Sequence, residues 1–489
     1  MFGLVTWAHV MMRPVEPNEQ MYIAASILSQ DAELYRDFAF LQMPNLPLLY
    51  AGLFRLTGTE HYLFLARSLT WLFTLGTCGA IAGIAWHYTR NSVSAALAAW
   101  LMALSENFIL TTGECSNYVM PMFLSLLGFW LVVCRVDRVS TLAVGILIGA
   151  AVGTKLYYAA LIPAFLGMVF FQTCSRRSQG LRLVSMLTGV GIGCLPSIWH
   201  LVKNPENFMF NNLWFHWETA NWFRSIEYSD RVTLLSRVRY GKSWLQHPSQ
   251  MWIVFGCIAV GVRQWMNWNS HPAKTDVGLA LSICGLSVVA SLSPVPAWPQ
   301  YFAMPIPFVL VWFLANLSDD PKRINYFLGC CVAVGVFVSG PYYVRCTTEA
   351  IHPSRWVPLA VHRQAIELFR ESTAFGHRPL VATFLPLLAL EAQCDIHVEF
   401  ATSGFLPQMA ERLTESQIQR YRTTSFRRIR GLLDSRTPDF IVTRIAWGSP
   451  GNSPSLDDSL AAYAAEHDFQ RTEFADLNLV VWKRILTTN

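Results

Sequence analysis

The chain has 489 residues, of which 53% are hydrophobic and only 14% are charged, and its mean hydropathy is positive. This composition excludes an ordinary soluble globular protein and predicts a polytopic membrane protein. The net charge of +5 is small for this length, and the basic residues fall in short connectors, so the charge indicates membrane topology and no nucleic-acid partner.

Apolar runs long enough to cross a bilayer follow one another along the first two thirds of the chain. Their approximate bounds are 63–86, 91–110, 118–134, 139–154, 156–171, 183–202, 251–266, 276–293, 300–316 and 324–344. With residues 2–12 they predict about eleven transmembrane helices. The run 2–12 is too short to span and lacks the basic start of a signal peptide, so we expect a missing or misassigned N-terminal stretch rather than a cleaved leader.

The connectors predict which side each loop faces, because short cytoplasmic loops are enriched in Lys and Arg. Basic residues occur on alternate connectors, at Arg90, Arg135, Arg138, Arg176, Arg177, Arg182, Arg263, Lys274, Lys322 and Arg323. These connectors are therefore predicted to be cytoplasmic. The segments predicted to face the outer side are the stretch 13–62, the connectors at Glu114 and Lys155, the loop 203–250 and the tail after Arg345. This arrangement predicts an odd number of spans.

The tail from 345 to 489 predicts a small extracytoplasmic α/β domain that follows a membrane domain at 1–344. Its apolar runs are typical of strands and alternate with stretches typical of helices. The expected strands are 380–385, 396–400, 440–443 and 477–482, and the expected helices are 357–371, 408–433 and 456–467. No glycine-rich phosphate loop follows these strands, so we expect no nucleotide site. Cys346 and Cys394 could form a disulfide or remain unpaired thiols.

Acidic residues mark the first outer stretch. Glu16 and Glu19 flank Pro17 at the start of an expected helix that runs to Leu28, and Asp37 follows in a second polar run. A charged group beside hydrocarbon is costly and therefore tends to mark a site. The alternative is structural, because a helix N-terminus favours Pro at its first position and carboxylates in its first turn.

Lys155 ends an apolar run on the same predicted side. A lone Lys at the membrane surface usually extends its ammonium to the headgroups. The connector that holds Lys155 is short, however, so its ammonium is expected at the level where the phosphate of a lipid-linked substrate would also lie.

The loop 203–250 is dense in aromatic residues, interleaved with Asn, His, Glu and Arg. Its polar candidates are His216 and Arg224, and Trp217 is its central aromatic candidate. The pattern is typical either of a belt at the headgroups or of a wall on which a sugar stacks and a phosphate is held. The spacing leaves both open.

Four short motifs carry a family resemblance. The acidic run at 16–22, the stretch Leu34 to Phe38 with its proline-containing continuation, Gly153-Thr154-Lys155, and Pro299-Gln300-Tyr301-Phe302 with Pro305 resemble membrane glycosyltransferases of the GT-C fold. The branch they resemble contains the protein O-mannosyltransferases and the bacterial transferase that puts aminoarabinose on lipid A, a branch like glycosyltransferase family 39.

The resemblance implies a polyprenyl-phosphate sugar donor, an acid of the first outer loop that acts on the acceptor, and basic residues that hold the lipid phosphate, with inversion at the anomeric carbon. This chain has Asn18 and Asn117 where the family usually has Asp, with Glu114 nearby, so the identity of the base and of any divalent metal site is open. The expected site residues are, for catalysis, Glu19, Glu16 and Asp37; for the donor phosphate, Lys155, Arg224 and His216; and for substrate binding, Tyr22, Glu114, Asn117, Trp217, Gln300 and Tyr301.

Of the two acids, Glu19 is expected to be the base. Glu16 precedes Pro17 and is therefore pushed to an extended conformation, where it caps the helix or faces the headgroups. Glu19 lies one turn inside the helix, on the face that continues through Tyr22. A bare carboxylate there would remain basic enough to accept a proton.

Two other function classes compete with a glycosyltransferase. A transporter or lipid flippase would need ionisable residues near the middle of several spans, whereas the charges here gather at the ends. A binding or assembly protein that has lost catalysis is consistent with Asn18 and Asn117.

Overall fold

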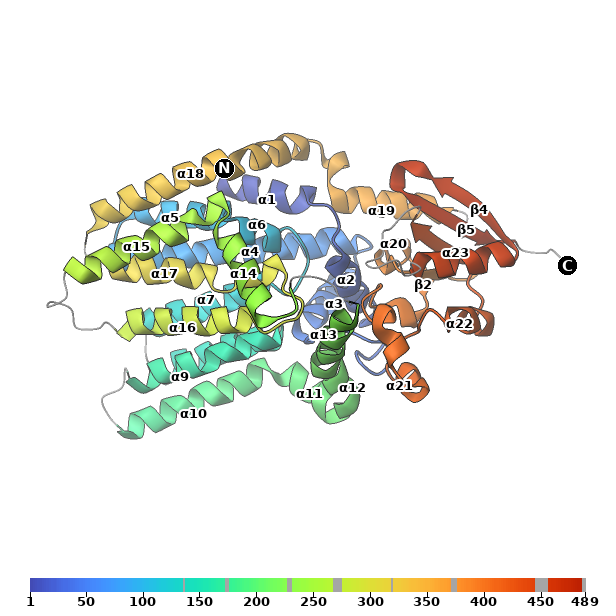
Figure 1. Ribbon diagram of the computed structural model, residues 1–489, viewed down its shortest axis with the longest axis horizontal. Coiled ribbons are helices and arrows are strands. Elements are labelled where there is room, and N and C mark those ends of the chain that lie inside the picture. The colour runs from blue at the N-terminus through green and yellow to red at the C-terminus, as the bar shows by residue number, and fades with distance from the viewer. Residues whose placement is uncertain are drawn as a thin grey trace. The chain divides into compact units, whose positions relative to one another are not determined.

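A computed structural model describes residues 1–134, 137–171, 176–226, 231–266, 275–317, 320–370, 376–444 and 456–485 (Figure 1). The chain divides into two compact units. The first contains Met1–Arg13, Ser68–Ile198 and Ser229–Ile351, and the second contains Pro14–Arg67, Trp199–Tyr228 and His352–Asn489. Arg135, Lys274 and the region around Ser455 lie outside the described residues.

The first unit is helical, and many of its helices run side by side in Figure 1. Its elements are α1 (Phe2–Met12), α5 (Ser92–Leu104), α6 (Glu106–Thr112), α7 (Val119–Cys134), α8 (Arg138–Val152), the 3₁₀ helix η1 (Leu156–Leu161), α9 (Ile162–Phe171), α10 (Arg176–Gly193), α14 (Leu234–Leu245), η3 (Pro248–Gln250), α15 (Met251–Met266), α16 (Thr275–Ser291), η4 (Pro299–Ala303), α17 (Ile306–Leu317) and α18 (Pro321–Ala350). The helices α4 (Tyr62–Thr89) and α11 (Leu195–Lys203) have residues in both units. Every predicted apolar run coincides with a helix or with two consecutive helices.

Length and composition allow three helices among the described residues to cross a membrane, namely α4, the continuous stretch Pro299–Leu317, and α18. The number rises to five if the bent pairs α5 with α6 and α10 with α11 each form one span, with bends of 70° and 62°. Further apolar helices of 10–17 residues include α1, α7, α8 and the stretch Leu156–Phe171. The chain is thus a multi-pass helical protein, and the count of about eleven spans stays a prediction.

Glycines bring α8 and α10 into close contact. Gly145 and Gly149 lie four residues apart on α8, and Gly189 and Gly193 repeat this spacing on α10. A Cβ at any of them would lie within 3 Å of a backbone atom of the facing helix. Small residues at this spacing let helix backbones pack closely in a bilayer, where no hydrophobic driving force between helices exists.

The second unit combines segments that are far apart in the sequence. The segments before the tail form α2 (Pro17–Leu28), α3 (Asn45–Thr57), α12 (Pro205–Met209), the π-helical turn η2 (Phe210–Trp214) and α13 (Phe215–Ser225). The tail adds η5 (Pro353–Arg355), α19 (Val357–Leu368), α20 (Pro386–Glu391), η7 (Val398–Phe400), η8 (Pro407–Arg412), α21 (Glu415–Arg420), α22 (Ile429–Ser435), α23 (Leu456–Glu466) and η9 (Ala475–Leu477).

The predicted α/β character of the tail is confirmed. Five strands form one sheet in the order β2-β1-β3-β5-β4, with bounds β1 (Leu380–Thr383), β2 (Asp395–Ile396), β3 (Phe440–Arg444), β4 (Phe469–Phe474) and β5 (Leu479–Arg484). The strand β1 is parallel to β2 and β3, whereas β5 is antiparallel to β3 and β4. Apolar residues of β1, β3, α22 and α23 form one core cluster, and Figure 1 shows these two helices beside the sheet.

Three details of the tail differ from the sequence prediction. The strand β4 was not predicted, because it is a largely exposed edge strand with polar residues and no apolar alternation. The expected strand 396–400 is mostly the 3₁₀ turn η7. The expected helix 408–433 is broken into η8, α21 and α22, because Thr414 caps a new helix and Arg422 takes the left-handed conformation with φ 49°. Cys346 and Cys394 are free thiols.

Candidate functional site

The helix α2 begins as the sequence predicts. Glu16 is its N-cap residue and is extended, with φ −95° and ψ 155°, directly before Pro17. The backbone N–H of Glu16 donates to Glu19 Oε2 at 3.2 Å. A carboxylate at the third helical position that accepts the N-cap N–H is the arrangement of a capping box. Glu19 therefore fixes the backbone conformation of Glu16. Glu16 itself is only partly buried.

Glu19 is not the bare carboxylate that we expected. Arg67 of α4 forms a bidentate ion pair with it, in which Nε donates to Oε1 at 3.0 Å and Nη2 donates to Oε2 at 2.7 Å. Both side chains are 0% exposed. Sequence reasoning missed Arg67, although a lone Arg inside the apolar run 63–86 was a signal, because an ionisable residue in such a run usually has a specific partner.

Asp37 and Tyr22 both make contacts within the stretch 13–62. Arg36 binds both Asp37 oxygens, at 2.9 and 2.8 Å, and the Glu33 N–H donates to the same carboxylate at 2.8 Å. The Arg36 hydrogen bond holds the pKa of Asp37 below its usual value, which makes this carboxylate a weaker proton acceptor. Tyr22 is 2% exposed and packs its ring edge-on against Phe40, with centroids 5.4 Å apart.

Lys155 lies inside the first unit rather than at its surface. Its residue is 4% exposed, and its Nζ donates to Asn117 Oδ1 at 2.8 Å. The same nitrogen lies 3.2 Å from the ring centre of Tyr118, 5.0 Å from that of Tyr157 and 5.5 Å from that of Tyr301. We call these five residues the lysine cage. Because the amine is enclosed, it does not extend toward headgroups as a lone interfacial Lys would.

The five residues of the lysine cage include no carboxylate. None of the ion pairs found in the described part of the chain includes Lys155. Burial lowers the pKa of Lys155 well below its usual value, and the charge of Glu114 opposes this effect. Glu114 is itself 4% exposed and accepts the Ser116 hydroxyl at 2.9 Å. The expected grouping of Lys155 with Glu114 and Asn117 is therefore found in this unit.

Of the two residues expected from the proline motif, Tyr301 belongs to the lysine cage and Gln300 adjoins it in η4. Tyr301 also contacts Tyr118, with ring centroids 6.4 Å apart. Gln300 is partly buried.

The candidates of the long loop lie on α13 and are exposed. Trp217 is 67% exposed, and His216 and Arg224 are also exposed. Arg224 Nη1 donates to Asn221 Oδ1 at 2.9 Å. Trp217, Asn221 and Arg224 follow at i, i+4 and i+7 and so share one helix face. This face suits either the headgroup belt or the rim of a sugar site.

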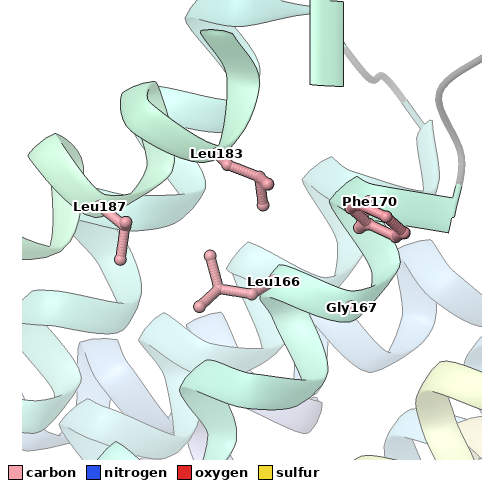
Figure 2. A pocket seen from close by; sticks show the side chains of 5 residues that line it. All are labelled: Leu166, Gly167, Phe170, Leu183 and Leu187. Atoms are coloured by element: carbon pink, nitrogen blue, oxygen red, sulfur yellow. The ribbon is translucent and has the colours of Figure 1, made fainter. Parts of the chain in front are cut away.

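An apolar groove of about 340 Å³ lies between α9 and α10 of the first unit. Figure 2 shows its lining side chains, Leu166, Phe170, Leu183 and Leu187, together with Gly167. It offers no group for acid–base chemistry. Among the described residues, no group of three or more His, Cys, Asp or Glu side chains could hold a metal ion.

Comparisons with known proteins agree with the predicted fold. The family model described as Glycosyltransferase family 87 matches residues 50–294. Two structures of ArnT from Cupriavidus metallidurans are similar over 99% of this chain. The form bound to undecaprenyl phosphate has a TM-score of 0.63 and 13% sequence identity, and the similarity covers 97% of its length. The apo form has a TM-score of 0.53 and 15% sequence identity, and the similarity covers 96% of its length.

A third structure, the Archaeoglobus fulgidus oligosaccharyltransferase in complex with Zn and sulfate, has TM-score 0.52 and 11% identity, over 91% of this chain and 67% of that one. The comparison with curated proteins gave no match. The predicted GT-C fold and glycosyltransferase class are confirmed, and the matching family is 87, whereas the motifs had pointed to a branch like family 39.

Proposed function

Because the chain belongs to glycosyltransferase family 87, we propose that it moves a sugar from a polyprenyl-phosphate donor to a cell-envelope acceptor, which is a lipid, a glycan or a protein. Transfer takes place at the extracytoplasmic face and inverts the anomeric carbon. The similar ArnT structure with bound undecaprenyl phosphate supports the donor class.

The lysine cage is the observation that carries this proposal. Lys155 offers three N–H donors, one of which is taken by Asn117 and another of which faces the Tyr118 ring. A buried amine is costly to charge without an anion, and a phosphate supplies that anion with charge-assisted hydrogen bonds. Burial lowers the pKa of Lys155, and a bound phosphate would oppose this effect by stabilising the charged form of the amine.

Glu16 is the better candidate for the base, which changes the order of preference between the two acids. Protonating Glu19 would leave the buried Arg67 charge without its partner, and breaking such a pair costs about 3–5 kcal/mol. Glu16 is only partly buried, and Glu19 holds its backbone N–H. The lowered pKa of Asp37 places it third.

The proposed reaction proceeds in one displacement. The Glu16 carboxylate takes the proton of the acceptor hydroxyl, whose oxygen bonds to the anomeric carbon as the bond from that carbon to the phosphate oxygen breaks. The anomeric carbon passes through an oxocarbenium-like state. Lys155, with Arg224 or His216, stabilises the departing polyprenyl phosphate.

The remaining candidates receive supporting roles. Asn117 orients the Lys155 amine through its hydrogen bond, and the charge of Glu114 favours the protonated form of that amine. Tyr301 and Gln300 lie beside the amine. Trp217 offers a stacking surface for a sugar. Tyr22 supports the fold of the α2 region through Phe40.

The proposed location is the inner (plasma) membrane, with about eleven spans and the tail domain outside. The alternation of basic connectors supports this topology.

A transfer assay with polyprenyl-phosphate sugars tests the proposal. Lys155→Ala is expected to weaken use of the donor tenfold to hundredfold, since a hydrogen bond to a charged group contributes about 1.5–3 kcal/mol. Lys155→Met removes the amine but fills much of the cage, and it should be equally impaired. The matched control is Lys242→Ala, because Lys242 is exposed on α14.

The proposed donor site is wrong if Lys155→Ala and Lys155→Met use the donor as the wild type does while Arg224→Ala abolishes transfer. Failure of the wild-type chain to transfer from any polyprenyl-phosphate sugar would instead overturn the donor class and favour a binding or assembly protein.

A further inference from the structure

The short helix α20 of the tail makes two buried hydrogen bonds, one to α2 and one to the first turn of α4. Its Leu387 N–H donates to Gln20 Oε1 of α2 at 3.1 Å. Its last residue, Glu391, accepts the Leu63 N–H of α4 at 2.6 Å through Oε1. All of these groups belong to the second unit. Each bond satisfies an N–H in the first turn of a helix, where no partner exists within the helix itself.

The second oxygen of Glu391 has a partner within the tail itself. Its Oε2 lies 2.8 Å from His362 Nδ1 of α19. The Glu391 side chain is 0% exposed and that of His362 is 13% exposed. His61 packs against His362, with ring centroids 4.0 Å apart. The carboxylate thus bridges the tail and the beginning of α4, and both of its oxygens have a partner.

Among the helices that α20 contacts, α2 and α4 are those that carry the buried ion pair. Gln20 directly follows Glu19 on α2. Leu63 lies four residues, or about one turn, before Arg67 on α4. Glu19 in turn accepts the Glu16 N–H. Hydrogen bonds therefore join His362 and Glu391 to the first turn of α4, and one turn later on the same helix hydrogen bonds join Arg67 to Glu19 and Glu19 to Glu16.

Burial alone does not explain these polar contacts. Apolar side chains would pack α20 against α2 and α4 without the cost of burying a carboxylate. A buried hydrogen bond with fixed partners instead fixes the register of one helix on another. The structure therefore gives α20 a role in setting where α2 and α4 lie.

We propose that Glu391 is a positioning residue for glycosyl transfer: together with Gln20, it places α2 and α4 so that the Glu19–Arg67 pair holds Glu16 in its productive position. This inference rests on the proposed function of Glu16. Misplacement of a reacting group by about 1 Å can lower a rate about 100-fold. A defect in positioning the base lowers kcat and leaves donor binding, which we assign to the lysine cage, nearly unchanged.

The test compares variants of the full-length chain in detergent, with the polyprenyl-phosphate sugar that the wild type uses. Glu391→Ala is expected to lower kcat about tenfold to a hundredfold, with a donor KM within about twofold of the wild type. Glu391→Gln keeps an oxygen for the Leu63 N–H and should retain kcat within about threefold. Asp395→Ala is the matched control, because Asp395 is an acid of the same domain whose side chain is 48% exposed.

Hydrogen exchange provides a second measurement that needs no donor. Glu391→Ala should speed exchange of the amides in the first turn of α2 while the central strands β1 and β3 stay protected. If Glu391→Ala is not recovered as folded protein, Gln20→Met decides, because it removes the contact from the side of α2 and leaves the tail intact.

The inference is overturned if the recovered variants keep the wild-type kcat, or if they change only the donor KM. It is also overturned if Glu391→Gln loses as much kcat as Glu391→Ala, since the Leu63 contact would then not be the cause. A wild-type chain without transfer activity, but with faster exchange at α2 in Glu391→Ala, would overturn the proposed function and leave the positioning contact standing.

Discussion

Glu19→Gln separates a structural role of this carboxylate from a catalytic one. The substitution keeps the shape of the side chain and one oxygen, but it removes the negative charge that faces Arg67. Both side chains are 0% exposed and are joined by two hydrogen bonds, at 2.7 and 3.0 Å. The guanidinium of Arg67 also donates to Pro14 O at 3.3 Å. This hydrogen bond keeps the Arg67 side chain buried when the carboxylate of Glu19 is replaced by an amide.

The expected cost follows from this burial. Removing one partner of a buried ion pair costs about 3–5 kcal/mol, because the other charge stays in a medium of low dielectric constant. At 1.4 kcal/mol for each factor of ten, the local folding equilibrium shifts by roughly 100-fold to 4,000-fold. Glu19→Gln should therefore lower the unfolding temperature of the purified protein. The double variant Glu19→Gln with Arg67→Met removes both charges and should recover most of the loss.

The assay measures unfolding and transfer on the same preparations. Thermal unfolding in detergent is followed for the wild type, Glu19→Gln, Arg67→Met and the double variant, and single-turnover transfer is followed for those that remain folded. Glu16→Gln is the matched acid-to-amide control. It should unfold like the wild type and lose transfer, because Glu16 is partly buried and is the proposed base.

One result would refute this reasoning. If Glu19→Gln unfolds at the wild-type temperature, binds donor and has no transfer activity, while Glu16→Gln keeps a substantial part of the activity, then Glu19 is the base, as the sequence first indicated. If both variants stay fully active, Asp37 and Glu114 are the next carboxylates to test.

Three further predictions concern topology, helix packing and pH. An impermeant thiol reagent added from outside should label a cysteine placed near Ser455 and miss one at Ser178; the reverse result would overturn the predicted orientation. Gly149→Leu should prevent close packing of α8 on α10 and lower the yield of folded protein, whereas unchanged yield would contradict the glycine contact. The Glu391 hydrogen bond raises the pKa of His362 above its usual value of 6.5. The pair between charged His362 and Glu391 therefore stabilises the folded protein fully below pH 6.5, and this stabilisation is lost as the pH rises through the raised pKa. The unfolding temperature should therefore fall on the alkaline side in the wild type and change less in His362→Gln; identical profiles would contradict the pair.

The sequence by itself determined the elements whose signal is local. Each apolar run coincides with a helix, because a bilayer-length run of apolar residues favours a helix wherever it lies in the chain. The strands β1, β3 and β5 were predicted because they are short apolar runs between polar segments. The start of α2 was also predicted, since Pro17 alone restricts the backbone of Glu16. In contrast, the edge strand β4 has no such pattern and was missed.

Only the tertiary structure decided which side chains are paired. Arg67 lies 48 residues from Glu19, and the Leu63 N–H lies 328 residues from Glu391. The Lys155 amine meets Asn117 across 38 residues. Such contacts depend on how helices pack, and helical periodicity does not encode the partner of a given face. The sequence therefore singled out Glu16, Glu19 and Lys155, but it missed Arg67, and it could not tell a carboxylate that accepts a proton from one that is buried against an arginine.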